Sequence, residues 1–196
     1  QETLAKGGDV EGGIDVLKWR AEHTPPEQLT GKDWIKAADL VAGSNPHLLA
    51  LIQEAGFGQR LAARECVRRF RLLQSLKPGA LCLHGTWGFG VVQKADALYK
   101  KIEINFRGRP GHGLAMKAAA ETLEVLGDDH VLARLHRDRD GLQRLVQEQP
   151  AEVVRLALAS FGPLTAAALQ EKLVQGGVLI EGDWKRFWDG ARKVLK

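Results

Sequence analysis

The sequence is poor in cysteine and has no long run of apolar residues. No stretch of the 196 residues approaches the roughly 18 consecutive apolar residues of a membrane span, and the first residues lack the features of a signal peptide. Two cysteines, Cys66 and Cys82, are too few for a disulfide framework, and with six scattered histidines they show no zinc-binding spacing. We therefore expect a cytoplasmic protein with no membrane contact, no metal and no other cofactor.

A large charge of one sign is also absent. The chain has 28 Lys and Arg against 24 Asp and Glu, a net charge of +4. With 44% hydrophobic and 27% charged residues, a packed core is expected and extensive disorder is not. The small basic excess permits a nucleic-acid partner without requiring one. Most of it falls in residues 77–126, which contain seven basic and four acidic residues.

Glycine and proline content and hydrophobic periodicity divide the chain into three predicted parts: an N-terminal helical region over 1–76, a small β-domain over 77–126 and a C-terminal helical region over 127–196. Asn45 before Pro46 is typical of a helix start, because asparagine caps and proline fits the first turn. The sequence therefore predicts an α+β fold that is mostly helical.

The middle part changes to a period of two. Residues 80–84, 88–92 and 101–106 have the pattern of short strands, and 114–116 could add one more. Residues 107–113 are predicted to form a loop because they are rich in glycine and contain proline. Several short strands joined by tight turns indicate a small curled sheet, which we predict to be an SH3-like β-barrel between the helical segments.

No motif indicates an active site. Gly85, Gly88 and Gly90 have the wrong order of gaps for a dinucleotide-binding loop, and glycines of a strand-turn-strand explain them better. The Asp-Asp-His triplet at 128–130 has adjacent carboxylates that point in different directions, so it is better explained as a helix cap than as a metal site. We therefore expect that the chain is not an enzyme.

Four arginines form a basic stripe on the predicted third helix. Arg60, Arg64, Arg68 and Arg71 fall on one face at helical spacing, opposite the apolar side chains. Such a stripe is a candidate for contact with phosphates or with an acidic protein surface. The alternative is that it is an ordinary solvated helix face.

The last predicted helix is basic and aromatic. Trp184 and Trp188 are surrounded by candidate nucleic-acid contacts: Lys185, Arg186, Arg192 and Lys193. Together with a preceding helix that Thr165 is predicted to cap, this segment could form a helix-turn-helix. We favour the alternative that both tryptophans are core anchors, because the intervening segment 176–183 is longer than the usual turn.

The middle of the chain carries a family resemblance. It contains Lys77-Pro78-Gly79, then His84, then Trp87-Gly88-Phe89-Gly90-Val91, followed by Ile102 to Phe106 and by Gly111-His112-Gly113. With the tail from Asp183 to Lys196, this pattern resembles the N-terminal extension of long members of the GreA/GreB transcript-cleavage factor family. The segment is similar, more distantly, to the Tudor-like RNA polymerase-interacting domains of CarD and Mfd proteins. The resemblance covers residues 76–196.

The resemblance implies a Tudor-like barrel that docks onto RNA polymerase. The residues expected to bind this partner lie in the strand turn and the neighbouring loop: His84, Trp87, Phe89, Arg107, Arg109 and His112. Aromatic side chains are common interface anchors, and a basic rim would favour an acidic partner surface. The alternative is that Trp87 and Phe89 fill the barrel core.

The resemblance also indicates that transcript cleavage is not expected of this chain. Gre-type cleavage uses a long antiparallel coiled coil with an acidic tip, and this chain contains no such pair of helices. We therefore expect a non-catalytic accessory region, covalently linked in its parent protein to a further C-terminal domain. The main alternative is a DNA- or RNA-binding module that uses the arginine stripe, the last helix or both. A helical scaffold that positions the β-domain is a third hypothesis.

Overall fold

The computed structural model describes residues 10–24, 31–43, 45–59 and 61–195. Its contacts group into two compact units. The first unit comprises residues 1–85 and 90–125, and the second comprises residues 86–89 and 126–196. The N-terminal helices thus share a unit with the sheet, while the division of the chain at residues 76 and 126 into three parts stays a prediction.

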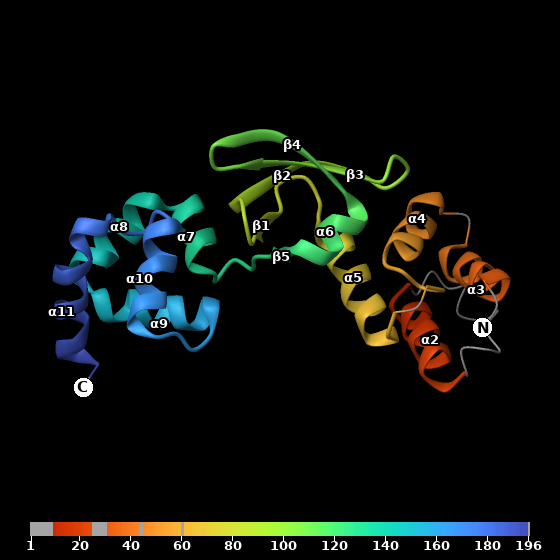
Figure 1. Ribbon diagram of the computed structural model, residues 1–196, viewed down its shortest axis with the longest axis horizontal. Helices are drawn as coiled ribbons and strands as arrows, with labels where there is room; N and C mark the ends of the chain where they lie inside the picture. Colours follow the sequence, from red (N-terminus) through yellow and green to blue (C-terminus); the bar gives the residue numbers. More distant parts are fainter. Residues whose placement is uncertain (1–9, 25–30, 44, 60, 196) are drawn as a thin grey trace. The chain divides into compact units, whose positions relative to one another are not determined.

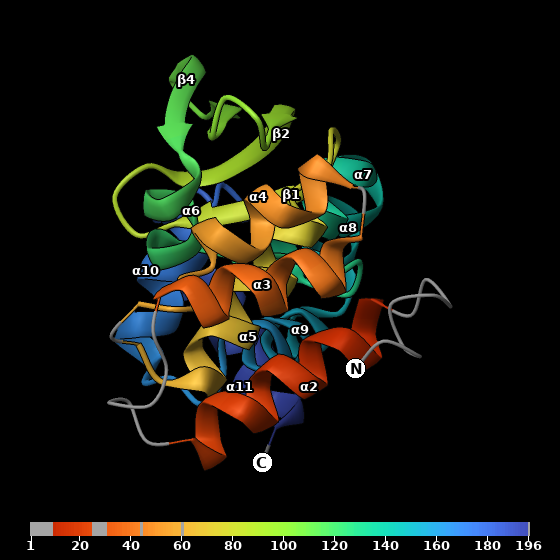
Figure 2. The same ribbon diagram turned by 90° about the vertical axis from the view of Figure 1, so that its right-hand side faces the viewer.

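Among the described residues, four helices precede the sheet in the first unit: α2 (Val10–His23), α3 (Gly31–Ala42), α4 (Pro46–Glu54) and α5 (Ala63–Ser75) (Figure 1). Figure 2 shows α2 and α3 side by side, and α5 also contacts α2. The predicted start of α4 is confirmed, because the side-chain oxygen of Asn45 accepts a hydrogen bond from the N–H of Leu48 at 3.1 Å. Ile14, Ile52 and Phe70 are fully buried and form part of the core of this unit.

The sheet has five strands: β1 (Leu81–His84), β2 (Gly88–Asp96), β3 (Lys101–Phe106), β4 (Arg109–Ala115) and β5 (Leu123–Val125). Their order is β4-β3-β2-β1-β5, and β3 pairs in the antiparallel sense with both β2 and β4. The helix α6 (Met116–Thr122) lies in the chain between β4 and β5. It contacts β3, β4 and α5.

The predicted closed barrel is wrong, whereas the prediction of a mostly helical α+β fold is confirmed. Strands β4 and β5 are the two edges of an open sheet. The reason lies in α6, which buries Met116, Ala119 and Ala120 and contacts the sheet and α5. A helix that packs against a sheet buries its apolar face without the sheet having to close on itself.

The loop predicted over residues 107–113 is also wrong for most of its length. From Arg109 onward these residues form β4, which pairs with β3. In this pairing Arg109 lies opposite Phe106, and His112 lies opposite Ile104. Glycine and proline suggested a loop, but an edge strand tolerates both, because one side of its backbone forms no hydrogen bonds with a neighbouring strand. Only Arg107 and Gly108 remain in the turn.

The alternation predicted for residues 101–106 is confirmed. Ile102, Ile104 and Phe106 are buried, and the residues between them are exposed. Opposite Phe106 on β2 lies Gly90. A Cβ atom at Gly90 would lie 2.6 Å from Cδ1 of Phe106, so the absence of a side chain there allows the phenyl ring to pack against β2.

The second unit is helical, with α7 (Val131–Arg137), α8 (Arg139–Glu148), α9 (Pro150–Phe161), α10 (Ala166–Gln175), the short 3-10 helix η2 (Glu181–Asp183) and α11 (Trp184–Val194). Thr165 caps α10 as predicted, accepting from the N–H of Ala168 at 3.2 Å. The cap predicted at Asp128 or Asp129 is instead formed by His130, whose Nδ1 accepts from the N–H of Leu132 at 3.1 Å.

Membrane-spanning potential is low along the described part of the chain. No single helix there is both long and apolar enough to cross a bilayer. Helices α9 and α10 pass this test of length and composition only when taken together, and they are bent by 89°.

Candidate interaction surfaces

The predicted polymerase-binding residues are distributed over three environments. His84 ends β1 and is buried, with 8% of its surface exposed. Its ring meets the ring of Phe106 edge-on, with the centroids 5.9 Å apart. The centroid of the His112 ring lies 6.0 Å from that of the same Phe106 ring. Burial, followed by the charge of His112, lowers the pKa of His84. His84 therefore belongs to the packing of the sheet.

Trp87 and Phe89 lie in and just after the turn between β1 and β2. Both side chains are half-buried. Residues 86–89 cluster with the C-terminal helical unit, and within it the ring of Phe89 lies 5.4 Å from that of His136. Phe89 is therefore partly engaged in packing within the second unit.

Arg107 and Arg109 flank Gly108 at the turn between β3 and β4, and both are exposed. Gly108 has a positive φ of 76°, which glycine adopts without strain. His112 lies further along β4 and is half-buried. The structure thus places the two predicted cations at the tip of an edge hairpin, with His112 on the strand beyond them.

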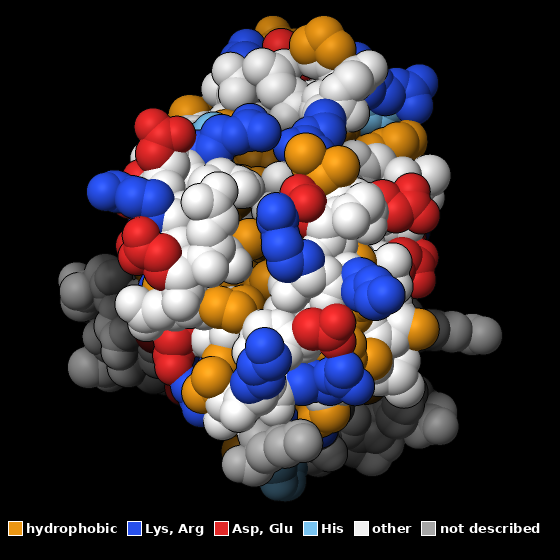
Figure 3. Space-filling model, turned by 90° about the vertical axis from the view of Figure 1, so that its left-hand side faces the viewer, with side chains coloured by type: hydrophobic (Ala, Val, Ile, Leu, Met, Phe, Trp, Pro, Cys, Tyr) orange, Lys and Arg blue, Asp and Glu red, His pale blue; other side chains and the backbone are white. Residues whose placement is uncertain are grey.

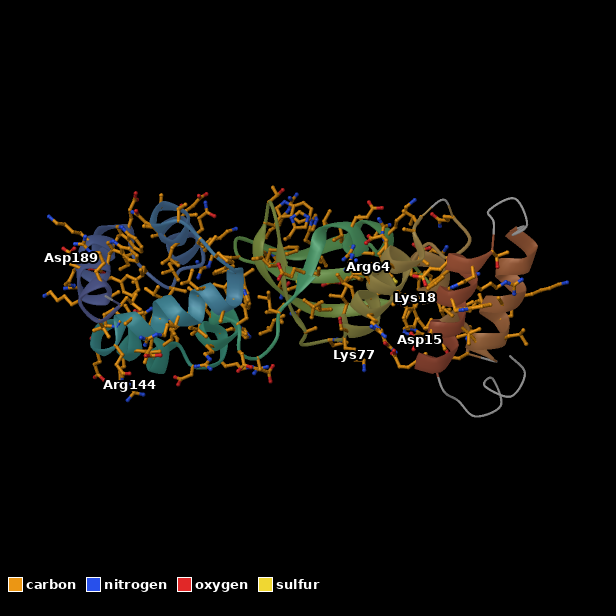
Figure 4. All side chains as sticks on the ribbon, turned by 90° about the horizontal axis from the view of Figure 1, so that it is seen from below. Asp15, Lys18, Arg64, Lys77, Arg144 and Asp189 are labelled. Carbon is orange, nitrogen blue, oxygen red and sulfur yellow. The ribbon has the colours of Figure 1, made fainter. Side chains whose placement is uncertain are left out.

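The arginine stripe is only partly available as a cationic surface. Arg60 lies outside the described residues, and Arg64 is exposed on α5 (Figure 4). Arg71 is held by Glu11 of α2, with Nη2 3.2 Å from the carboxylate oxygen. That pair joins two exposed side chains, so it contributes little to stability but reduces the local positive charge.

A network that sequence reasoning missed neutralises the middle of the stripe. Glu65 accepts two hydrogen bonds of 2.8 Å from Arg68, which also donates to the carbonyl oxygen of Ala120 at 2.9 Å. The nearly buried Arg69 donates to Glu65 at 2.7 Å and to Glu121 of α6 at 3.0 Å. The signal was present in the i, i+3 and i, i+4 spacing of these charges. Their role is to join α5 to α6.

Replacing Glu65 by glutamine is expected to remove a pH-dependent part of the stability. Hydrogen bonds from Arg68, then Arg69, lower the pKa of Glu65 from 4.5 to about 2. The stabilisation is therefore complete above pH 4.5 and is lost as the pH falls toward 2. We expect Glu65→Gln to lower the free energy of unfolding at pH 7 by on the order of 1–2 kcal/mol, with a smaller effect in acid.

Urea unfolding at several pH values measures this difference. Glu22→Gln, at an exposed position of α2, is the control and should follow the wild type. A difference between Glu65→Gln and wild type that is constant from pH 7 to pH 2 would contradict the assignment.

Helix α11 has one buried and one basic face. Phe187 and Ala191 are buried, whereas Trp184 and Trp188 are half-buried. The two tryptophan rings are stacked, with centroids 5.3 Å apart and planes inclined by 13°. The prediction that the tryptophans are the core anchors is therefore only partly met, since Phe187 contributes the buried anchor.

All four cations predicted on this helix are exposed: Lys185, Arg186, Arg192 and Lys193. Arg186 pairs with Asp183 at 2.9 Å and Arg192 with Asp189 at 2.6 Å; Asp189 is labelled in Figure 4. Figure 3 shows a face of the molecule on which Lys and Arg side chains are interspersed with acidic and apolar ones. The basic character is therefore a local property of α11.

Comparison with known proteins finds similarity to Gre-type sequences. Residues 132–196 match the family described as the GRAD helix-turn-helix domain. The chain is 35% identical over 130 residues to "Transcription elongation factor GreA" of Chlamydia pneumoniae, which covers 65% of this chain and 18% of that protein. It is 29% identical over 143 residues to the protein of the same name from Chlamydia trachomatis serovar D, covering 72% and 20%.

A third relative aligns with almost the whole chain. It is the "Putative GreA-associated domains protein" of Treponema pallidum (strain Nichols), 26% identical over 186 residues, or 93% of this chain and 28% of that protein. The chain thus spans less than a third of each of these relatives. No solved structure matches.

These matches confirm the resemblance to Gre-type factors but not the Tudor-like part of it. They also favour the helix-turn-helix interpretation of the C-terminal helices, which the sequence reasoning had ranked second. The chain is therefore similar to GreA-type transcription elongation factors, and its C-terminal third is similar to the GRAD helix-turn-helix domain.

Proposed function

We propose that this chain is a non-catalytic accessory region of a Gre-type transcription elongation factor and contacts RNA polymerase in the cytoplasm. The observation that carries the proposal is its similarity to two elongation factors over about two thirds of its length. Because the matched regions are about a fifth of those factors, the role proposed is that of one part of a larger protein.

The open sheet supports a docking role. Strand β4 is an edge of the sheet, and a partner strand can extend such an edge through main-chain hydrogen bonds. Arg107 and Arg109 stand exposed at the hairpin that begins this edge, where they would favour an acidic partner surface. Half-buried Trp87, which clusters with the second unit, is proposed as a separate aromatic contact with the partner.

Capture of core RNA polymerase on the immobilised chain tests the proposal. The wild type is expected to retain polymerase, and Trp87→Ala is expected to weaken retention by roughly tenfold, since buried aromatic anchors carry much of the energy of an interface. The amount of retained polymerase, measured over a range of concentrations, gives the affinities.

The matched control is Trp19→Ala. Trp19 is 61% exposed on α2 and has no part in the proposed surface, so this variant should retain polymerase like the wild type. Equal retention by a folded Trp87→Ala variant would remove Trp87 from the interface, and no retention by the wild type would overturn the docking proposal. Added to a stalled elongation complex, the chain should leave the transcript at its original length.

A second candidate function is nucleic-acid binding through α11. The match to a helix-turn-helix domain favours it, because such domains place one helix against DNA. Among the described residues, no carboxylate lies within ion-pair distance of Lys185 or Lys193. These two lysines are therefore the candidates for phosphate contact.

A gel shift at about 50 mM and about 200 mM salt tests this function, because phosphate contacts release counterions and binding weakens steeply with salt. Lys185→Gln is expected to weaken binding severalfold. The control is Arg144→Gln, which removes an exposed charge from α8 (Figure 4) and should change binding much less. Absence of any shift at the lower salt concentration would overturn nucleic-acid binding.

A further inference from the structure

We propose that α11 carries a stacking platform for unpaired nucleobases, formed by Trp184 and Trp188 with Lys185 and Arg192 beside them. The ligand class is single-stranded nucleic acid. This inference rests on the second proposed function and specifies its ligand and the side chains that would contact it.

The platform follows from helical spacing. Trp184, Trp188 and Arg192 are each four residues apart, so they form one continuous ridge along α11. The indole rings are nearly parallel, with planes inclined by 13°. The ring of buried Phe187 lies 5.8 Å from that of Trp184 and limits the positions that this indole can take. The stacked pair is thus held in place, and both indoles remain partly exposed.

The charges beside the platform are those that a nucleic-acid strand requires. The helix α11 contains four Lys and Arg residues but one acidic residue, Asp189. Lys185 precedes Trp188 by three residues and Arg192 follows it by four, so both cations neighbour the rings. Lys185 is exposed, and the side chain of Arg192 is 59% exposed while it pairs with Asp189. Phosphates flanking a stacked base would therefore meet positive charge.

The same residues fit an unpaired strand better than a duplex. In the major groove, base edges are read by side chains such as Arg, Asn and Gln that form hydrogen bonds in pairs. Helix α11 begins instead with Trp184 and has a second indole one turn later. The flat faces of indoles bind bases by stacking, which requires that the bases are unstacked from a duplex.

Fluorescence anisotropy of labelled oligonucleotides tests the platform. The probes are oligothymidine and oligouridine of about 12 nucleotides and a DNA duplex of the same length. The wild type is expected to bind both single strands more tightly than the duplex. The double variant Trp184→Leu/Trp188→Leu is expected to lose roughly tenfold or more in affinity for the single strands, since each stacked base contributes substantially, and to lose little for the duplex.

The control is Trp19→Leu, which removes an exposed tryptophan from α2 and should leave all three affinities unchanged. Leucine preserves apolar burial on α11, and circular dichroism shows whether the double variant is folded. If the double variant is not folded, the single variant Trp188→Leu is compared with the wild type instead. The measurement is the quenching of tryptophan emission when oligothymidine is added. Quenching by stacking is expected in the wild type and should be markedly reduced in Trp188→Leu.

Three results would overturn the platform: single-strand affinity unchanged in the folded double variant, quenching equal in Trp188→Leu and wild type, or tighter binding of the wild type to the duplex. Lys185→Gln separates this failure from failure of the second proposed function. If that variant weakens binding of every probe while the tryptophan variants do not, α11 binds nucleic acid through its charges alone. Similar affinities for the two single strands are expected, because stacking uses ring faces that DNA and RNA share.

Discussion

Replacing Gly90 by alanine is expected to lower the free energy of unfolding of the first unit by roughly 3 kcal/mol. The added Cβ would lie 2.6 Å from Cδ1 of Phe106 and 2.7 Å from Cγ2 of Ile104. Both neighbours are buried, with 4% and 0% of their surfaces exposed. Neither side chain can move without opening the buried face of the sheet, so the core has no room for the extra methyl group.

Gly85→Ala provides a matched control in the preceding turn. A Cβ at Gly85 would meet no atom within 4 Å, and Gly85 is exposed, so this variant should stay within about 0.5 kcal/mol of the wild type. Urea denaturation followed by circular dichroism compares the two. Equal midpoints for Gly90→Ala and Gly85→Ala would show that the sheet relaxes around the extra methyl group.

Replacing Phe187 by alanine is expected to destabilise the second unit by about 3–5 kcal/mol. Phe187 is 4% exposed and is the large apolar side chain by which α11 enters the core of this unit, where α11 packs against α9. Truncation removes the apolar contacts and leaves a cavity, and both effects reduce stability. Because the indole of Trp184 lies against Phe187, nucleic-acid binding by α11 should weaken as well.

Val194→Ala is the control within the same helix. Val194 is 62% exposed, so the loss of its methyl groups should cost little stability. Denaturant unfolding monitored by tryptophan emission reports on this region, because Trp184 and Trp188 lie on α11. A Phe187→Ala variant with the stability of Val194→Ala would contradict the placement of Phe187 in the core.

Local signals in the sequence were read correctly where neighbouring residues along the chain suffice. Asn45 and Thr165 cap their helices as predicted, because a cap involves a side chain and an N–H three residues later. The strand Lys101–Phe106 has the predicted bounds, since alternation of polar and apolar residues directly encodes its two faces.

Predictions failed where the deciding partner is distant in the sequence. Residues 109–113 of β4 were predicted to be a loop, because their pairing with β3, and not their composition, holds them in a strand. The barrel was predicted from short strands and tight turns, but those features do not say whether the sheet closes. The role of Arg69 was missed because Glu121, one of its partners, lies 52 residues further along the chain.

The sequence by itself determined the mostly helical α+β class, the basic character of α11 and the Gre-related motifs around Trp87. These depend on composition, spacing and short-range periodicity, all of which are local. Only the tertiary structure decided that the sheet is open, that His84 is buried, and that Arg68 and Arg69 join α5 to α6. Each of these depends on which distant surfaces bury one another, and burial is a property of the packed chain.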